Sequence, residues 1–193
     1  MASEPVTSES EQRRLFVAVP LPTSVTPAIE AAVGPWRARF PQARWVQPQD
    51  RHVTLKFMGP TPRRLDAWLH DRIGEVAAST QAFEIRLTRL GAFPSNRRAR
   101  VLWVGLEDGA GHLATMAKGL DRGLAPEFAP DRRPFTPHVT VARSDRALEL
   151  PNDLAGSPLP GPTVAVSEIV LFRSRIGRSS ARYEALESYL LRG

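Results

Sequence analysis

A six-residue phrase occurs twice in the sequence, as His-Val-Thr-Leu-Lys-Phe at residues 52–57 and as His-Val-Thr-Val-Ala-Arg at residues 138–143. Both copies consist largely of residues that favour β-strands. Side chains alternate between the two faces of a strand, so the His and Thr of each triplet share one face and the valine between them takes the other. We therefore expect the valines in a core. The two imidazoles and two hydroxyls are expected around one cleft, an arrangement suited to acid–base chemistry on a phosphate.

The surroundings of the triplets are duplicated as well. An apolar stretch begins at Leu15, 37 residues before His52, and another begins at Val101, 37 residues before His138. Each interval also contains a helical stretch. Apolar strands at similar spacings are common in β-rich domains, so the spacing alone is weak evidence for a duplication. It becomes strong evidence in combination with the two triplets. Together they predict two related halves that face each other across a shared groove, with one triplet on each side.

Apolar periodicity and turn residues predict three helical stretches. They cover residues 24–40, 61–79 and 109–124. Pro35 is expected to kink or end the first. Thr61 and Pro62 have the pattern of an N-cap followed by a favoured first helical residue.

Alternating and apolar runs predict the strands, which cover residues 14–20, 83–87, 99–106, 163–172 and 182–190 besides the two triplet strands and a short strand after Arg44. Residues 91–98 are expected to be a turn or loop, and residues 151–162, rich in proline, are expected to lack regular structure. The sum is an α+β fold with mainly antiparallel strands and two main helices. Residues 1–12 are expected to be disordered, leaving a single two-lobed domain over residues 13–193.

The composition excludes several kinds of chemistry. The chain contains no cysteine, which rules out disulfides, thiolate catalysis and cysteine-based zinc sites. His70 and His112 lie on predicted helices without the spacing of a dedicated metal site, so no metal and no other cofactor is expected. No long apolar run and no signal-peptide pattern is present, which favours a cytoplasmic protein without a membrane partner. We expect a monomer.

The charge balance is basic. The formal net charge is +6, and 24 of the 26 basic residues are arginines. Arginine presents a planar fork that suits phosphate, so this balance is consistent with an RNA or nucleotide partner. A GC-rich genome also favours arginine over lysine, and that bias explains part of the ratio without removing the charge.

Two histidines can divide the work of phosphodiester cleavage. Imidazole exchanges protons near pH 7, so one His can deprotonate a nucleophile while the other protonates a leaving sugar oxygen. The threonines can hydrogen-bond a phosphoryl oxygen as negative charge builds on it. A single His-x-Thr would more often be a structural histidine in a strand, but two copies in matched contexts favour catalysis by His52, Thr54, His138 and Thr140.

The paired triplets resemble the two-histidine phosphoesterase superfamily. The phrases at residues 14–22, 52–59 and 133–140 further resemble the bacterial and archaeal RNA 2′,3′-cyclic phosphodiesterases, a family first named as 2′-5′ RNA ligases. The resemblance covers residues 14–190. It implies a bilobal fold of two mainly antiparallel sheets related by a pseudo-twofold axis, with helices outside and a V-shaped central cleft.

The same resemblance implies the chemistry. Its members hydrolyse terminal 2′,3′-cyclic phosphates on RNA ends or nucleotides to 2′-phosphomonoesters without a metal or nucleotide cofactor, and joining of ends through a 2′-5′ linkage is known in the family. By this resemblance His138 would activate water, His52 would protonate the departing 3′ oxygen, and Thr54 and Thr140 would hold phosphate oxygens. The two histidines of a near-symmetric site can exchange these roles.

Residues next to the triplets are further candidates for substrate binding. Arg143 matches an arginine of the family, although in a regular strand it has the opposite parity to His138 and needs a bulge or a strand end to reach the phosphate. Lys56 has the parity of His52 and could neutralise phosphate, whereas Phe57 has the parity of the core. Arg133 lies on a loop near the second triplet and could contact an RNA backbone. The basic cluster of Arg97, Arg98 and Arg100 is either a solvated turn or an RNA contact.

Two other functions fit the same residues. One is a phosphodiesterase for a small nucleotide, such as a cyclic ADP-ribose phosphate or a 2′-5′ oligoadenylate. The other is a non-catalytic module that binds RNA ends, although binding alone would not need two proton carriers.

Overall fold

The strands form one curled antiparallel sheet. The computed structural model describes residues 12–151, 156, 158–176 and 181–193. In the described residues the strands are β1 (Gln12–Pro20), β2 (Arg44–Trp45), β3 (His52–Pro62), β4 (Phe83–Phe93), β5 (Ala99–Glu107), β6 (His138–Leu148), β7 (Thr163–Val166), β8 (Glu168–Ile176) and β9 (Ala181–Leu190). Their order is β7-β4-β5-β6-β3-β1-β8-β9, and β2 adds to β6. The predicted disorder at residues 1–12 falls outside the described residues except for Gln12, which already belongs to β1.

The centre of this order relates the two halves of the sheet. β3 and β6 pair antiparallel at Val53 and Val139, and the next strands outward are β1 on one side and β5 on the other. β8 and β9 then match β4 and β7. The expected two lobes are therefore present, but their sheets are joined through β3 and β6 into one. Both central valines are fully buried, as the alternation predicted.

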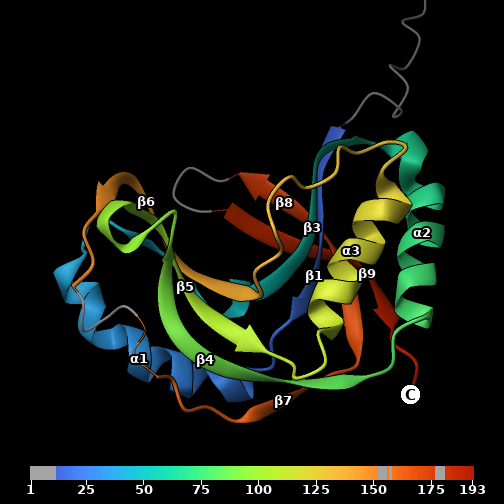
Figure 1. Ribbon diagram of the computed structural model, residues 1–193. Helices are drawn as coiled ribbons and strands as arrows, with labels where there is room; N and C mark the ends of the chain where they lie inside the picture. The colour runs from blue at the N-terminus through green and yellow to red at the C-terminus, as the bar shows by residue number, and fades with distance from the viewer. Residues whose placement is uncertain (1–11, 152–155, 157, 177–180) are drawn as a thin grey trace, which may run out of the picture.

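The predicted strand at residues 163–172 is in fact two strands. β7 pairs with β4 and β8 pairs with β1, although only Ser167 separates them in sequence. β7 is at one end of the strand order and β8 is one strand from the other end, so the sheet must curl until its outer parts approach each other (Figure 1). The alternation of Val164 and Val166 breaks at Ser167 and Glu168, which is the point where the partner strand changes.

Three α-helices of similar length occur in the described residues, one within each of the three predicted helical stretches, although only two of these were expected to be main helices. They are α1 (Thr26–Arg39), α2 (Asp66–Ala78) and α3 (His112–Leu124). α2 and α3 lie side by side, away from α1 (Figure 1). α3 contacts β3 and α2 contacts β9, whereas residues of α1 line a small gap with Leu90, Leu102 and Val141 of the other half of the sheet. Each half is thus covered on one face by helix.

Two helix boundaries differ from the prediction. Thr61 and Pro62 end β3 instead of starting a helix; the Thr61 hydroxyl is buried and donates to the carbonyl oxygen of Gly59 (3.0 Å). α2 begins only after a 3-10 turn. Pro35 lies within α1, which continues to Arg39. In the described parts of the chain, no helix is long and apolar enough to cross a membrane.

Candidate active site

A bulge occurs at the same point after each triplet. In β3, Thr54 is opposite Ala18 and Lys56 is opposite Val17, so Leu55 is an extra residue. In β6, Thr140 is opposite Trp103 and Ala142 is opposite Leu102, so Val141 is extra. A bulge shifts the alternation of all later side chains by one residue. The third residue after each threonine therefore returns to the face that carries the His and the Thr, which we call the site face.

This shift decides which candidates reach the site. Arg143 lies on the site face with His138 and Thr140, so the bulge supplies the exception that its parity required. Phe57 lies on the site face as well, with 48% of its surface exposed, and the prediction that it packs in the core is wrong. Lys56 is turned to the opposite face, and the parity predicted for it is wrong.

Lys56 is enclosed beneath α3 and the loop that follows it. Its side chain is 1% exposed, and its ammonium contacts the carboxylate of Asp121, the carbonyl oxygen of Ala129 (2.9 Å) and the carboxylate of Asp131 (3.4 Å). All three of its N–H groups thus have an acceptor within the protein. We therefore withdraw the substrate contact that the sequence suggested for Lys56.

The two triplets meet at the centre of the sheet. Because Val53 and Val139 are antiparallel partners, His52 lies on the side of Thr140, and His138 lies on the side of Thr54. Directly opposed residues in antiparallel strands are about 5 Å apart, which brings both histidines within reach of a single phosphate. The sheet register therefore brings together the four residues that the sequence proposed as catalytic.

The two imidazoles are held in the same way. Nδ1 of His52 is 2.8 Å from the carbonyl oxygen of Asp50, and Nδ1 of His138 is 2.7 Å from the carbonyl oxygen of Thr136. A carbonyl oxygen only accepts hydrogen bonds, so Nδ1 carries the proton in both rings. The neutral form of each ring then has its lone pair on Nε2, which is free to exchange protons with a ligand.

Aromatic side chains enclose His52. The rings of Phe16 (4.8 Å between centroids), Phe172 (6.1 Å) and Tyr183 (4.9 Å, edge-on) surround it. The pKa of His52 is lowered to about 4, chiefly by burial among these rings; the hydrogen bond to Asp50 opposes this, and the charges of Arg143 and His138 contribute to it.

His138 has a thinner aromatic cover. Phe93 lies edge-on to it at 5.0 Å and Trp103 lies at 6.4 Å. The indole of Trp103 lies against Gly91, where a Cβ atom would come within 2.3 Å of the ring, so the glycine is needed there. Burial lowers the pKa of His138 below its usual range, and Arg143 adds to this. Both histidines therefore favour the neutral form when no anion is bound.

Tyr183 is a site residue that the sequence analysis missed. It lies on β9, touches His52, and is close enough to Arg143 and Asp50 for both charges to affect the pKa of its hydroxyl; burial raises that pKa. β9 is two strands from β1, so only the tertiary fold brings Tyr183 to His52. No local motif around Tyr183 could have indicated this.

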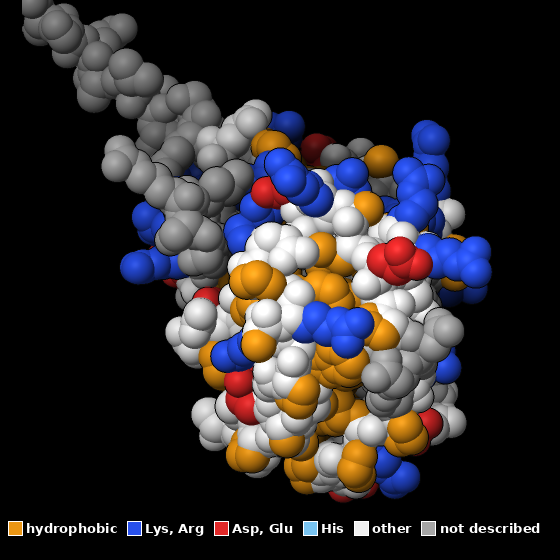
Figure 2. Space-filling model, turned by 90° about the vertical axis from the view of Figure 1, so that its left-hand side faces the viewer, with side chains coloured by type: hydrophobic (Ala, Val, Ile, Leu, Met, Phe, Trp, Pro, Cys, Tyr) orange, Lys and Arg blue, Asp and Glu red, His pale blue; other side chains and the backbone are white. Residues whose placement is uncertain are grey.

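The remaining candidates lie outside this centre. Arg133 is exposed on the loop between α3 and β6, and Arg97 and Arg98 are exposed on the turn before β5. Arg100 donates to the carbonyl oxygen of Asp145 (2.7 Å). Figure 2 shows basic side chains spread around the upper part of the face formed by α1, β6 and β5. None of these contacts tests a role in RNA binding.

The other two histidines have structural partners. His70 is exposed and paired with Glu187 (2.8 Å), which raises its pKa. His112 stacks on Phe83 (4.8 Å). Within the described residues no group of three or more His, Asp or Glu side chains is placed to hold a metal ion.

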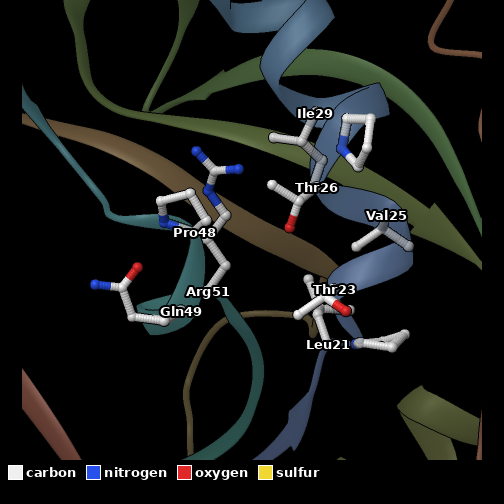
Figure 3. A pocket seen from close by; sticks show the side chains of 10 residues that line it. Leu21, Thr23, Val25, Thr26, Ile29, Pro48, Gln49 and Arg51 are labelled. Atoms are coloured by element: carbon white, nitrogen blue, oxygen red, sulfur yellow. The ribbon is translucent and has the colours of Figure 1, made fainter.

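A separate pocket of about 410 Å³ lies beside the turn that precedes His52 (Figure 3). Its walls are the 3-10 turn that contains Thr23, the first residue of α1, Thr26, and the turn residues Pro48 and Gln49. It contains none of the triplet residues. Arg51 passes between these walls, and its guanidinium is bound by Glu30 and by the carbonyl oxygen of Val46 (3.3 Å).

The sequence is similar to one protein family and to several named proteins. The model of the 2′-5′ RNA ligase superfamily matches residues 25–178. A protein named RNA 2′,3′-cyclic phosphodiesterase from Geobacillus stearothermophilus is 32% identical over 92% of this chain, which spans 57% of that relative's length. A protein of the same name from Thermus thermophilus is 33% identical, with 93% of this chain and 91% of the relative covered.

The fold also matches solved structures. The crystal structure of Escherichia coli LigT complexed with 3′-AMP superposes with a TM-score of 0.75 at 27% identity, and the match covers 94% of this chain and 99% of that one. Other crystal structures of the E. coli protein contain ATP, NADP+ or phosphate. The curled sheet with few helices is therefore the fold of these phosphoesterases.

Proposed function

Because the chain belongs to the 2′-5′ RNA ligase superfamily, we propose that it is an RNA 2′,3′-cyclic phosphodiesterase that hydrolyses terminal 2′,3′-cyclic phosphates to 2′-phosphomonoesters. The observation that carries this proposal is the pair of imidazoles, each with Nδ1 fixed by a backbone carbonyl and Nε2 free, on antiparallel strands that meet between them. The names of the relatives from G. stearothermophilus and T. thermophilus agree with it.

The reaction needs two proton transfers. Nε2 of one histidine takes a proton from water as its oxygen attacks phosphorus, and Nε2 of the other gives a proton to O3′ as the P–O3′ bond breaks. With a sugar 5′-hydroxyl as the nucleophile in place of water, the same two transfers would form a 2′-5′ linkage. The resemblance to the family gives the base role to His138 and the acid role to His52. The lower pKa of His52 favours the opposite division, because the base must start neutral.

The phosphate would be held by groups around the two histidines. Thr54 and Thr140 present hydroxyls on the site face, and Arg143 supplies a cation whose charge reaches both imidazoles. A bound phosphate anion would raise both histidine pKa values and oppose the effect of burial. The exposed ring of Phe57, on the same face, could stack on a nucleobase. Arg133 could contact the RNA backbone from its loop.

A second candidate function is hydrolysis of a small cyclic nucleotide or a 2′-5′ oligoadenylate. The observation in its favour is that E. coli LigT has been crystallised with 3′-AMP, ATP and NADP+, which are single nucleotides or a dinucleotide. Either substrate would use the same histidines. We also propose that residues 13–193 act as one two-lobed unit, since the triplets come from different halves. A monomeric state stays a prediction.

The test is a substrate panel. Purified protein is given 2′,3′-cyclic mononucleotides, RNAs that end in a cyclic phosphate, and 2′-5′ oligoadenylate, and the position of the product phosphate is determined. The proposal expects 2′-phosphate products from the RNAs. Cleavage of only the small nucleotides would support the second candidate, and binding without turnover would identify a non-catalytic RNA-end-binding module.

A further inference from the structure

The buried ammonium of Lys56 connects the first triplet strand with the loop that leads to the second triplet. Lys56 comes two residues after Thr54, and its contacts are the carboxylates of Asp121 and Asp131 and the carbonyl oxygen of Ala129. Asp121 also accepts the backbone N–H of Asp131 (3.0 Å). One cation in β3 therefore binds both the last turn of α3 and the middle of the loop.

This loop sets the position of an acceptor for the second catalytic histidine. It has no helix or strand between α3 and β6, and its second-to-last residue is Thr136, whose carbonyl oxygen accepts from Nδ1 of His138. The backbone N–H of Leu106 donates to the carbonyl oxygen of Pro137 (3.3 Å). The middle of the loop, at residues 129–131, is bound by Lys56 and Asp121.

The chain segment that precedes His52 is held by different contacts. There the buried side chain of Arg51, next to the histidine itself, binds Glu30 of α1 and the carbonyl oxygen of Val46. The residue in the same place before His138 is Pro137, which has no side chain that could bind in this way. The cation that binds the loop before His138 is Lys56, which belongs to the other half of the sheet and contacts the loop at Ala129 and Asp131.

We propose that Lys56 is a positioning residue for His138: through Asp121, Ala129 and Asp131 it fixes the loop that carries the Thr136 carbonyl, and so fixes the tautomer and direction of the His138 imidazole. The kinetic part of this inference rests on the proposed function. The tautomer part does not, because it concerns the protein without substrate.

A buried ion pair could also serve stability alone. Removing one partner of such a pair leaves an unpaired charge and destabilises most proteins, so loss of stability in a Lys56 variant decides nothing. The matched control is Arg13, whose side chain is 9% exposed and paired with Asp66 of α2. Arg13 ties β1 to α2 and touches neither the loop nor a triplet.

The first experiment measures the tautomer of His138 by nitrogen-15 NMR in the ligand-free protein at a pH where the ring is neutral. The variants are the double substitution Lys56→Met with Asp121→Asn, which leaves no unpaired buried charge, and Arg13→Met with Asp66→Asn. A His138→Gln protein identifies the signal. The wild type and the Arg13 pair should show only the Nδ1–H form, and the Lys56 pair should show a mixture with Nε2–H. An unchanged Nδ1–H signal in the Lys56 pair would overturn the proposal.

The second experiment measures kcat and KM with a 2′,3′-cyclic mononucleotide, which is too small to depend on RNA contacts of the loop. Misplacement of a catalytic group costs up to about 100-fold in rate, so the Lys56 pair should lose about tenfold or more in kcat with KM little changed. Asp131→Asn, at an exposed residue, is a milder variant that should fold and lose less. The Arg13 pair should keep its kcat.

The outcomes separate this inference from the proposed function. If the wild type hydrolyses cyclic phosphates and the Lys56 pair keeps its full kcat, the positioning role is rejected and the proposed function still holds. A wild type without that activity would reject the function, and the tautomer measurement would still decide the role of Lys56.

Discussion

The His52 half and the His138 half have one backbone plan and different side chains. In both, a buried valine follows the histidine, a bulge follows the threonine, and a third residue returns to the site face. That residue is the exposed aromatic Phe57 in one half and the cation Arg143 in the other. The shared backbone thus places two imidazoles in equivalent positions, while the side chains after the bulges make one side suited to a ring and the other to an anion.

The surroundings of the two histidines also differ, because more aromatic rings lie around His52 than around His138. Three aromatic rings enclose His52, whereas Phe93 and the more distant Trp103 cover His138. Burial consequently depresses the pKa of His52 to about 4, well below its ordinary value. A near-symmetric backbone can therefore hold two histidines with unequal affinity for protons, which is what acid–base catalysis by a pair requires.

Removal of either imidazole should have the largest effect. We expect His52→Ala and His138→Ala each to lower kcat by roughly 10²–10⁴-fold, because each supplies one proton transfer. The double variant should lose little beyond the worse single variant if both act in one step. The measurement is hydrolysis of a cyclic mononucleotide, with circular dichroism to check folding. A single variant that keeps more than about a tenth of the activity would remove that histidine from the mechanism.

The second-largest effect is expected from alanine substitutions of Arg143 and Phe57, the two residues that the bulges bring to the site face. Arg143→Ala should lower kcat/KM by about 10–100-fold for every substrate, since a charged hydrogen bond is worth about 1.5–3 kcal/mol. Phe57→Ala should lower it less, by about tenfold, and should depend on the nucleobase, since stacking is worth about 1–3 kcal/mol. Comparison of cyclic adenosine and cyclic uridine phosphates checks this. Equal losses for both bases in Phe57→Ala would show that its ring does not stack.

The difference in burial predicts how stability depends on pH. The folded protein holds His52 with a pKa of about 4, while in the unfolded chain the pKa is near 6.5, so the unfolded state binds more protons between these values. This contribution to the free energy of unfolding is fully present above about pH 6.5 and is lost as the pH falls toward 4. Its size is about 3 kcal/mol. Denaturant unfolding from pH 7 to 4 measures it.

Glutamine variants compare the two histidines directly. His52→Gln should flatten the fall in stability with acid more than His138→Gln does, because burial is greater around His52. If the two variants flatten the curve equally, the unequal burial of the two rings has no thermodynamic consequence.

The pH dependence of kcat/KM should be bell-shaped and centred below neutrality. One histidine must be protonated and the other neutral in the free protein, and burial lowers both pKa values. Activity should rise as the pH increases through about 4 and fall above the pKa of His138, which lies below its ordinary value of 6.5. A value of kcat/KM that increases steadily up to about pH 9 would indicate hydroxide as the nucleophile.

The smallest effect concerns the basic surface. Affinity for a cyclic-phosphate-ended oligonucleotide should fall with salt more steeply than affinity for a mononucleotide, because each neutralised phosphate of a single strand adds about −0.7 to the slope. Arg97→Glu with Arg98→Glu should weaken oligonucleotide binding and spare mononucleotide hydrolysis. Equal salt slopes for both ligands would favour the small-nucleotide function and assign the arginines to genomic bias.

The sequence by itself determined the two triplets, the burial of Val53 and Val139, and the antiparallel α+β class. These follow from local alternation of apolar and polar residues and from the repetition of one phrase, both of which can be read without knowing which strands pair. The matched spacing of strand, helix and triplet was likewise enough to expect two halves that share a site.

Only the tertiary structure decided the side of the sheet on which the residues after the triplets lie. In each bulge, two residues of β3 or β6 face one residue of the partner strand, β1 or β5. As a result, Arg143 and Phe57 reach the site face and Lys56 becomes buried. Tyr183 reaches His52 and β7 parts from β8 for a related reason, the curl of the sheet. Pairing and curl depend on contacts between segments far apart in the chain, which no local pattern records.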